Sequence, residues 1–273
     1  MQEELHFACR LAASVRAALY NDLDFSFVLA DYIDKAEFRF MPRKKSLFGG
    51  FSTASPDMWY NHLLELGLDD IFAQTNSTLK CIFENGTAAE FTVAFRSRRA
   101  SVLDSDCAPT MIDGAVPAIG WRFRLTRYDS VKAVVTERPA SNERVKTQYE
   151  PQPLRGAIER MEQFSAELTG SGGYAAEYAR RFQQAAQIFD GKQVKTGDRI
   201  EPLPTVCAAL MPLYLAAEYA DVLYEGCPLE ITAQKAGRSA EYTQLCSELT
   251  VQIRTAMVYA VNSTTTITAP QGV

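Results

Sequence analysis

The dipeptide Asn85-Gly86 is the feature that most constrains how this chain can fold. Apolar and polar residues alternate in residues 78–84 before it and again in residues 90–98 after it. Asn-Gly between two such stretches is a strong hairpin signal, because both residues tolerate the positive φ of a tight turn. The sequence therefore predicts an antiparallel hairpin, and with it a sheet in the N-terminal half.

The loop length follows from the face on which each strand carries its apolar residues. A two-residue loop would pair Phe83 with Ala88 and put the two apolar sets on opposite faces. A three-residue loop, Glu84–Gly86, pairs Phe83 with Thr87 and puts both sets on one face. We therefore predict the three-residue loop, with Gly86 in the left-handed conformation. The residues that then share a face are Leu79, Cys81, Phe83, Phe91, Val93 and Phe95.

Periodicity and capping signals give the remaining elements of the N-terminal half. We predict a helix over residues 2–20, a strand over 36–40, a helix from Pro56 through Leu66 with Ser55 as its N-cap, and strands over 120–127 and 131–137. Residues 25–33 fit either a strand or a short helix. We interpret Leu68–Gln74 as one or two further helical turns, Arg99–Pro117 as irregular, and Tyr128–Ser130 as the turn between two strands.

The C-terminal half has only helical periodicity. Residues 139–153 are polar with three prolines, and we place the boundary between the halves there. Helices are predicted over 154–168, 174–189, 204–224 with a kink at Pro212, and 242–261, with no strand of four or more residues between Pro153 and Val261. The predicted class is α+β: an antiparallel sheet of at least four strands with N-terminal helices, then an all-helical half. The predicted units are a sheet domain over 1–140, a helical domain or layer over 151–262, and a tail over 263–273.

Composition excludes several classes of protein. Of the 273 residues, 47% are hydrophobic, so a packed core is expected and wholesale disorder is not. The net charge of −5 argues against a general nucleic-acid binder, which needs a basic surface. The start of the chain lacks a signal peptide, and the most apolar segment, residues 206–217, is too short to span a bilayer. We expect a soluble, cytoplasmic protein that binds no membrane.

Cysteine spacing and short motifs indicate no cofactor and no metal. None of the six cysteines forms a C-x-x-C pair, which argues for free thiols rather than a zinc site. Phosphate-binding and nucleophile-elbow motifs are absent. Asp104-Ser-Asp106 has the spacing of a divalent-metal site, but so short a pattern is common by chance. The basic loop over residues 43–50 ends in two glycines and is a weak anion-site candidate against a plain solvated loop.

The candidates for catalysis are two histidines and two carboxylates. His6 and Cys9 lie three residues apart on a helix, a spacing that suits a nucleophile pair or two structural residues. His62 is a candidate general base, or a hydrogen-bonded surface residue. Glu218 and Asp221 lie on the most apolar helix and need a partner or a raised pKa. We expect them at the rim of the helix or paired with one of Arg180, Arg181 and Arg254.

Four arginines form the candidate binding site. Phe91, Val93 and Phe95 predict the core side of one strand, which puts Arg96 and Arg98 on the other side. The same alternation places Arg122 and Arg124 opposite Trp121, Phe123 and Leu125. If the strands share a core side, all four arginines gather on one face, suited to carboxylates or phosphates. The alternative is an ordinary solvated face.

The sequence does not specify a function, and we consider three hypotheses. The first is a non-catalytic binding or interaction protein whose arginine face takes an anionic small molecule or an acidic protein partner. The second is an enzyme acting on a small phosphorylated or carboxylated substrate. It would require a catalytic carboxylate or His62 beside the arginines. The third is a structural oligomer built through the long C-terminal helix.

Overall fold

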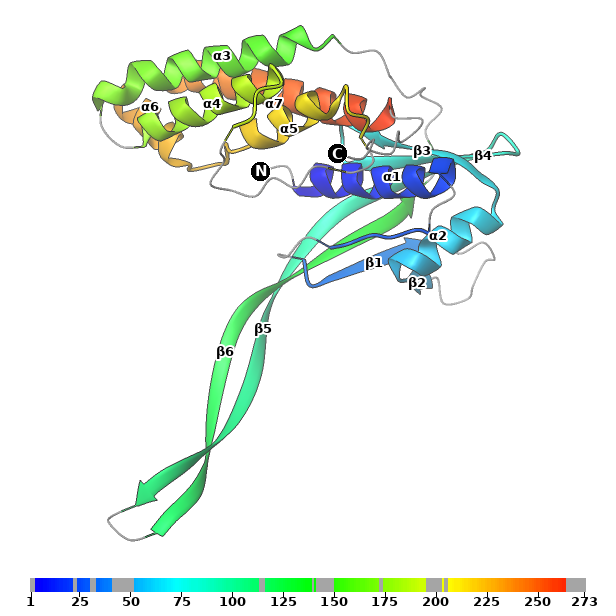
Figure 1. Cartoon of the computed structure of the whole chain (residues 1–273), viewed down its shortest axis with the longest axis vertical. Helices are drawn as coiled ribbons and strands as arrows, with labels where there is room; N and C mark the ends of the chain where they lie inside the picture. Colours follow the sequence, from blue (N-terminus) through cyan, green and yellow to red (C-terminus); the bar gives the residue numbers. More distant parts are fainter. Residues whose placement is uncertain are drawn as a thin grey trace.

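The structure is a computed structural model with an α+β fold, as the sequence predicted: an N-terminal helix, a six-stranded sheet and a helical C-terminal half (Figure 1). For residues 52, 97–112, 116–130 and 171 only the backbone is described. The described residues are 3–21, 24–29, 33–40, 52–112, 116–138, 140, 150–171, 174–194, 203 and 206–263.

The first half contains two helices and all six strands of the sheet. Its elements are α1 (Glu3–Asn21), β1 (Lys35–Phe40), β2 (Ser52–Ala54), α2 (Pro56–Glu65), β3 (Leu68–Gln74), β4 (Thr78–Phe83), β5 (Ala88–Ile112) and β6 (Val116–Arg138). The strand order is β2-β1-β6-β5-β4-β3. Every neighbouring pair is antiparallel except β1 with β6, which is parallel. The predicted N-cap is present, since the Ser55 Oγ accepts from the Met58 N–H at 3.3 Å.

The hairpin prediction is confirmed in both its register and its turn. The Phe83 N–H donates to the Thr87 carbonyl at 3.0 Å, and Gly86 has a φ of +76°. The register pairs Leu79 with Phe91. The predicted apolar face is buried over Leu79, Cys81, Phe83, Phe91 and Val93, and Phe95 is half-buried.

Three predictions in the sheet half were wrong. Leu68–Gln74 is strand β3 rather than helix, because a bulge between Leu68 and Asp70 shifts the alternation that would have marked it. Arg99–Pro117 is not irregular, since most of it belongs to β5 and β6. Residues 128–130 form no turn: Tyr128 is paired with Ala100, inside the continuous strand β6.

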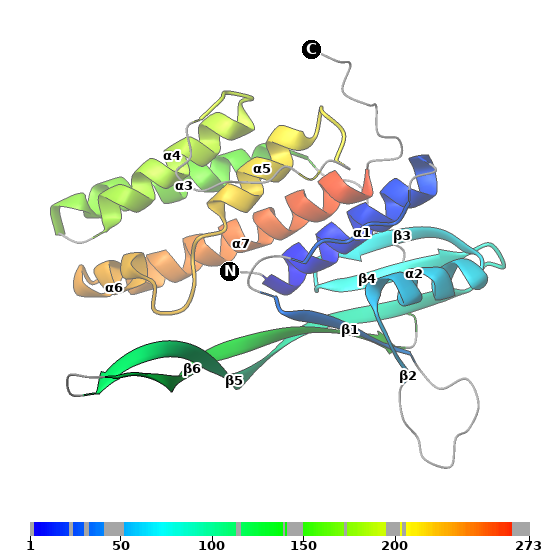
Figure 2. The same ribbon diagram turned by 60° about the horizontal axis from the view of Figure 1, so that its bottom comes forward.

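The two longest strands extend past the rest of the sheet as a two-stranded ribbon. The pairing of β4 with β5 ends at Thr92, and the pairing of β1 with β6 begins at Lys132. From Ser97–Val131 to Ile112–Val116, β5 and β6 pair only with each other, for sixteen residue pairs. At about 3.3 Å per residue this arm is roughly 50 Å long. Figures 1 and 2 show it projecting from the body.

The second half is helical wherever it is described. It consists of α3 (Gln152–Glu167), a 3-10 turn η1 (Leu168–Ser171), α4 (Ala175–Phe189), α5 (Met211–Ala220), α6 (Pro228–Lys235) and α7 (Ser239–Asn262). The described residues between Pro153 and Val261 contain no strand, as predicted. The predicted helix over 204–224 is shorter and unkinked, because Pro212 lies in the first turn of α5, where its missing N–H costs nothing.

The two halves share one hydrophobic core. A single cluster of buried residues includes Phe38 and Leu79 from the sheet and Phe164 and Met257 from the helices. Helix α1 lies between the sheet and α7 (Figures 1 and 2) and contacts both. The boundaries at residues 140 and 151 remain a prediction, and residues 264–273 of the predicted tail lie outside the described residues.

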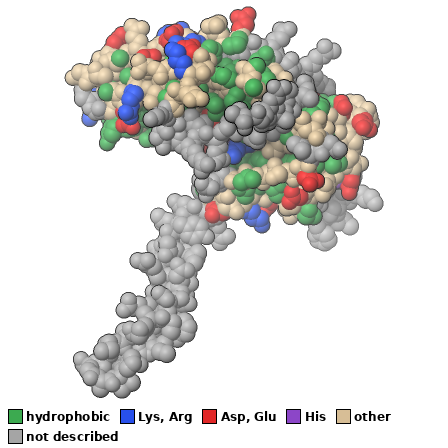
Figure 3. Space-filling view, viewed as in Figure 1, with side chains coloured by type: hydrophobic (Ala, Val, Ile, Leu, Met, Phe, Trp, Pro, Cys, Tyr) green, Lys and Arg blue, Asp and Glu red, His purple; other side chains and the backbone are tan. Residues whose placement is uncertain are grey.

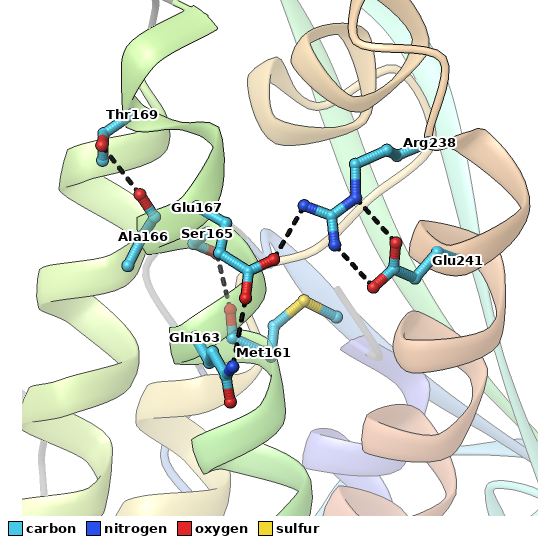
Figure 4. A network of polar contacts seen from close by, with 8 residues as sticks. All are labelled: Met161, Gln163, Ser165, Ala166, Glu167, Thr169, Arg238 and Glu241. Atoms are coloured by element: carbon cyan, nitrogen blue, oxygen red, sulfur yellow. Dashed lines mark hydrogen bonds and ion pairs between the residues drawn. The ribbon is translucent and has the colours of Figure 1, made fainter.

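A polar network fastens the end of α3 to the beginning of α7 (Figure 4). The Arg238 guanidinium donates from Nε and Nη2 to the Glu241 carboxylate, both at 2.7 Å. Its Nη1 lies 2.9 Å from a Glu167 oxygen, and its Cζ lies 4.7 Å from the centre of the Phe164 ring. The two carboxylates raise the pKa of Arg238, with Glu241 as the larger cause.

Candidate functional site

The four predicted arginines lie on the arm and at its base, in two separated pairs. Arg96 is exposed and opposite Lys132, and Arg98 is opposite Ser130. The residue opposite Arg124 lies six positions along β5 from Arg98, about 20 Å away. The structure therefore does not bring the two pairs together. The side chains of Arg98, Arg122 and Arg124 lie outside those that the structure describes, and binding at these four residues stays a prediction.

The register of the arm places opposite charges across the two strands. Arg122 is paired with Asp106, and Arg124 with Asp104. Directly opposed residues of opposite charge stabilise an antiparallel pair by about 0.2–1 kcal/mol each. These two aspartates, a candidate metal pair in the sequence, thus have arginines as their strand partners. The described side chains contain no group of three or more His, Cys, Asp or Glu arranged to hold a metal ion.

His62 and Cys9, the other candidates from the sequence, make contacts that suit structural residues. His62 lies edge-on to the Phe40 ring at 4.5 Å, and its Nδ1 is 3.9 Å from a Glu65 oxygen. Cys9 is completely buried, and burial raises the pKa of its thiol, with a further rise from Glu218. A thiol with a raised pKa is a poor nucleophile at neutral pH. Residues 43–50 lie outside the described residues.

A second candidate site lies where the first turns of α1 meet the end of α5. The His6 Nε2 is 2.9 Å from an Asp221 carboxylate oxygen, and the His6 Nδ1 is 3.9 Å from a Glu218 oxygen. Asp221 is the C-cap of α5, where the helix dipole disfavours a negative charge. Its side chain is 5% exposed, so the hydrogen bond to His6 compensates for part of the desolvation.

Arg181 on α4 brings a cation to the same place. Its Cζ lies 4.7 Å from the centre of the Tyr219 ring, and its Nε donates to the Tyr219 carbonyl at 3.4 Å. The Tyr219 hydroxyl in turn donates to Gln184 at 2.7 Å. These contacts fix the direction of the guanidinium relative to α5.

Two adjoining cavities share Arg181 and Asp221 in their walls. The smaller, of about 220 Å³, is bordered by His6 and Glu218 together with apolar residues such as Phe27. The larger, of about 490 Å³, lies on the side of α4 and the loop after α5. Its walls include Tyr174, Glu177, Tyr178, Val222, Tyr224 and Pro228. A volume of a few hundred Å³ suits a small organic molecule.

Sequence reasoning found part of this site. It selected Glu218 and Asp221 because carboxylates on an apolar helix need partners, and it named Arg181 among the possible partners. Arg181 does share the cavity walls with Asp221. The hydrogen bond from His6 was missed, because the helical spacing of His6 pointed only to Cys9.

Comparison with known proteins provides no relative: no family model, no curated protein and no solved structure matches the chain. Among the described residues, no helix has both the length and the apolar character needed to cross a membrane.

Proposed function

We propose that this chain is a non-catalytic interaction protein that binds an acidic partner with the arm formed by β5 and β6. The observation that carries the proposal is the arm itself, about sixteen residue pairs that no other strand accompanies. A two-stranded ribbon alone is at best marginally stable in water. A partner that covers it would supply contacts beyond those between the two strands.

Charge favours an acidic partner. Residues 96–132 contain seven Arg or Lys and four Asp, a formal charge of +3 in a chain whose net charge is −5. The body is correspondingly acidic, and Figure 3 shows acidic side chains around α2. An arm of opposite sign to its body attracts an acidic surface and orients it during encounter.

Within the arm, the base is the stronger anchor for an anion. Arg96 and Arg98 are opposite Lys132 and Ser130, so neither has an acidic strand partner. Arg122 and Arg124, by contrast, face aspartates across the ribbon. Of these two pairs of arginines, only the pair near the middle of the arm has aspartates opposite it with which an incoming carboxylate would compete.

The enzyme alternative draws little support from the arginines. It required His62 or a catalytic carboxylate beside them. The contacts of His62 are with Phe40 and Glu65. The carboxylates opposite Arg122 and Arg124 are those of Asp106 and Asp104, which are explained as charge-complementary strand partners. It is therefore the weaker proposal.

The proposal is tested with a fluorescein-labelled oligoglutamate peptide followed by fluorescence anisotropy. The wild-type chain should bind it at low ionic strength and release it as salt screens the charges. Arg96→Glu with Arg98→Glu should weaken binding about tenfold or more. Arg122→Glu with Arg124→Glu should weaken it less, because these two arginines already face aspartates across the ribbon.

Two control variants separate the arm from general charge. Lys192→Glu with Lys235→Glu makes the same charge change at exposed sites on the helical half and should change the affinity less than about twofold. A chain with residues 100–128 replaced by Asn-Gly keeps Arg96 and Arg98 but loses most of the arm. If this shortened chain binds as tightly as the wild type, the arm is not the docking element. If the control lysines matter as much as the arginines, the binding is nonspecific.

A further inference from the structure

The larger cavity is walled mainly by aromatic and acidic side chains. Tyr174, Tyr178 and Tyr224 line it together with Glu177 and Asp221. Tyr174 and Tyr224 are 61% and 53% exposed, so their rings are accessible to a ligand in the cavity. Aromatic faces and carboxylates share one affinity, because both attract positive charge.

The charge balance of the cavity is negative. Among the described residues that line it, two carboxylates outnumber one guanidinium, that of Arg181. Contacts with the Tyr219 ring and carbonyl direct that guanidinium, so it does not neutralise the two carboxylates equally. The smaller cavity adds Glu218, whose oxygen lies 3.9 Å from His6.

Tyr178 acts as an aromatic surface rather than as an anion. Burial raises the pKa of Tyr178, and the neighbouring Cys227 raises it further. A neutral phenol presents its ring face to a cation and its hydroxyl to a polar group.

We infer that the larger cavity is a binding site for a small organic amine, with the ammonium group between Glu177 and Asp221 and the apolar body against the tyrosines. The site is independent of the arm and of its acidic partner. Val222 and Pro228 complete the apolar part of the wall. The volume of about 490 Å³ accommodates a molecule with one aromatic ring and a short side chain.

Three probes of nearly equal shape test the charge preference. They are 2-phenylethylamine, 2-phenylethanol and phenylacetate, which are cationic, neutral and anionic at neutral pH. Isothermal titration calorimetry on the full chain should show the amine binding at least about tenfold more tightly than either of the others. Tighter binding of phenylacetate would overturn the inference, and so would no detectable binding of the amine at about 5 mM.

Variants at exposed wall residues locate the binding without threatening the fold. Glu177→Gln should weaken amine binding about fivefold by removing one carboxylate. Tyr174→Ala should weaken it several-fold and Tyr174→Phe should not, because the ring face rather than the hydroxyl contacts the cation.

The matched control is Glu225→Gln, at an exposed carboxylate next to Tyr224 that borders neither cavity. It should change the affinity less than about twofold, because a solvated charge outside the wall is screened. If Glu225→Gln weakens binding as much as Glu177→Gln, the amine is attracted by general surface charge, and the assigned site is wrong. Binding that survives Glu177→Gln and Tyr174→Ala together also contradicts the assignment.

Discussion

Asn262, in the last turn of α7, forms hydrogen bonds with the backbone of the edge strand of the sheet. Strand β3 is an edge strand, so the outward backbone groups of Ala73 have no strand to pair with. The Asn262 amide supplies both partners: its Oδ1 accepts from the Ala73 N–H at 2.9 Å, and its Nδ2 donates to the Ala73 carbonyl at 2.8 Å. Asn262 is 4% exposed, so water cannot replace it. The Asn262 side chain thus makes the two hydrogen bonds that a neighbouring strand would otherwise make with Ala73.

Replacing Asn262 with Ala should destabilise the protein by about 2–4 kcal/mol. The change leaves the Ala73 N–H and carbonyl buried without partners, at roughly 1–3 kcal/mol for each group. Alanine regains about 0.7 kcal/mol as a better helix former. At roughly 2–4 °C per kcal/mol for a chain of this size, the melting midpoint should fall by about 4–16 °C.

The Asn262→Asp variant distinguishes lost hydrogen bonds from a lost packing contact. A protonated Asp reproduces both hydrogen bonds, whereas an ionised one points a buried charge at the Ala73 carbonyl. Folding should therefore raise the pKa of this carboxyl above its unfolded value of about 3.9. The native state then binds more protons than the unfolded state, so the stability of the variant falls as pH rises.

Urea unfolding followed by circular dichroism, between about pH 4 and pH 7, measures both effects. The control is Asn61→Ala, on the exposed surface of α2, which should change stability by less than about 0.5 kcal/mol. The reasoning is refuted if Asn262→Ala is as stable as this control. It is also refuted if Asn262→Asp loses no stability, relative to the wild type, between pH 4 and pH 7.

Three smaller changes test other contacts. Arg238→Ala should lower stability by about 1 kcal/mol, since the partly exposed network of Figure 4 is screened by solvent, and an unchanged melting midpoint would contradict this. Hydrogen bonds, the larger from Lys132, lower the pKa of Glu37, so its stabilisation is present above about pH 4.3 and lost as pH falls through the folded-state pKa. Glu37→Gln should therefore flatten the acid side of the stability profile measured by urea unfolding, and an identical profile would be evidence against the pairing. Gly86→Ala should cost about 1 kcal/mol from backbone strain alone, because nothing lies within 4 Å of an added Cβ at φ +76°, whereas Gly170→Ala, at a glycine without positive φ, should cost less in the same melting assay.

Elements with an unbroken apolar pattern could be predicted from the sequence. The α7 stripe contains Tyr242, Leu249 and Ile253, all buried as its helical period requires. The hairpin was predictable to the register because the apolar alternation on both sides of Asn85-Gly86 allows only one loop length. In both cases the residues that must be buried are also the ones that the local backbone geometry favours.

The failed predictions share one cause, which is that local features interrupt the apolar alternation by which a strand is recognised. The bulge in β3 breaks the period of two at Asp70. Along the arm, Pro109 and Gly120 weaken strand propensity, yet each is paired with the opposite strand. The alternation of residues 120–127 was sufficient to predict a strand there, whereas residues 99–117 offered no comparable pattern.

The cavity site was only half predictable, because burial reveals that a polar group needs a partner but not which one. Asp221 was singled out for its place on an apolar helix. Its hydrogen-bond partner His6 lies 215 positions away, on a helix whose own spacing offered only Cys9. The identity of the partner depends on how α1 and α5 are placed relative to each other, and both helices pack against α7 through residues of the shared core. The same core packing brings α4, which carries Arg181, against α5. The candidate binding chemistry is therefore a consequence of core packing, and single substitutions at Glu177 and Tyr174 can test it without disturbing the core.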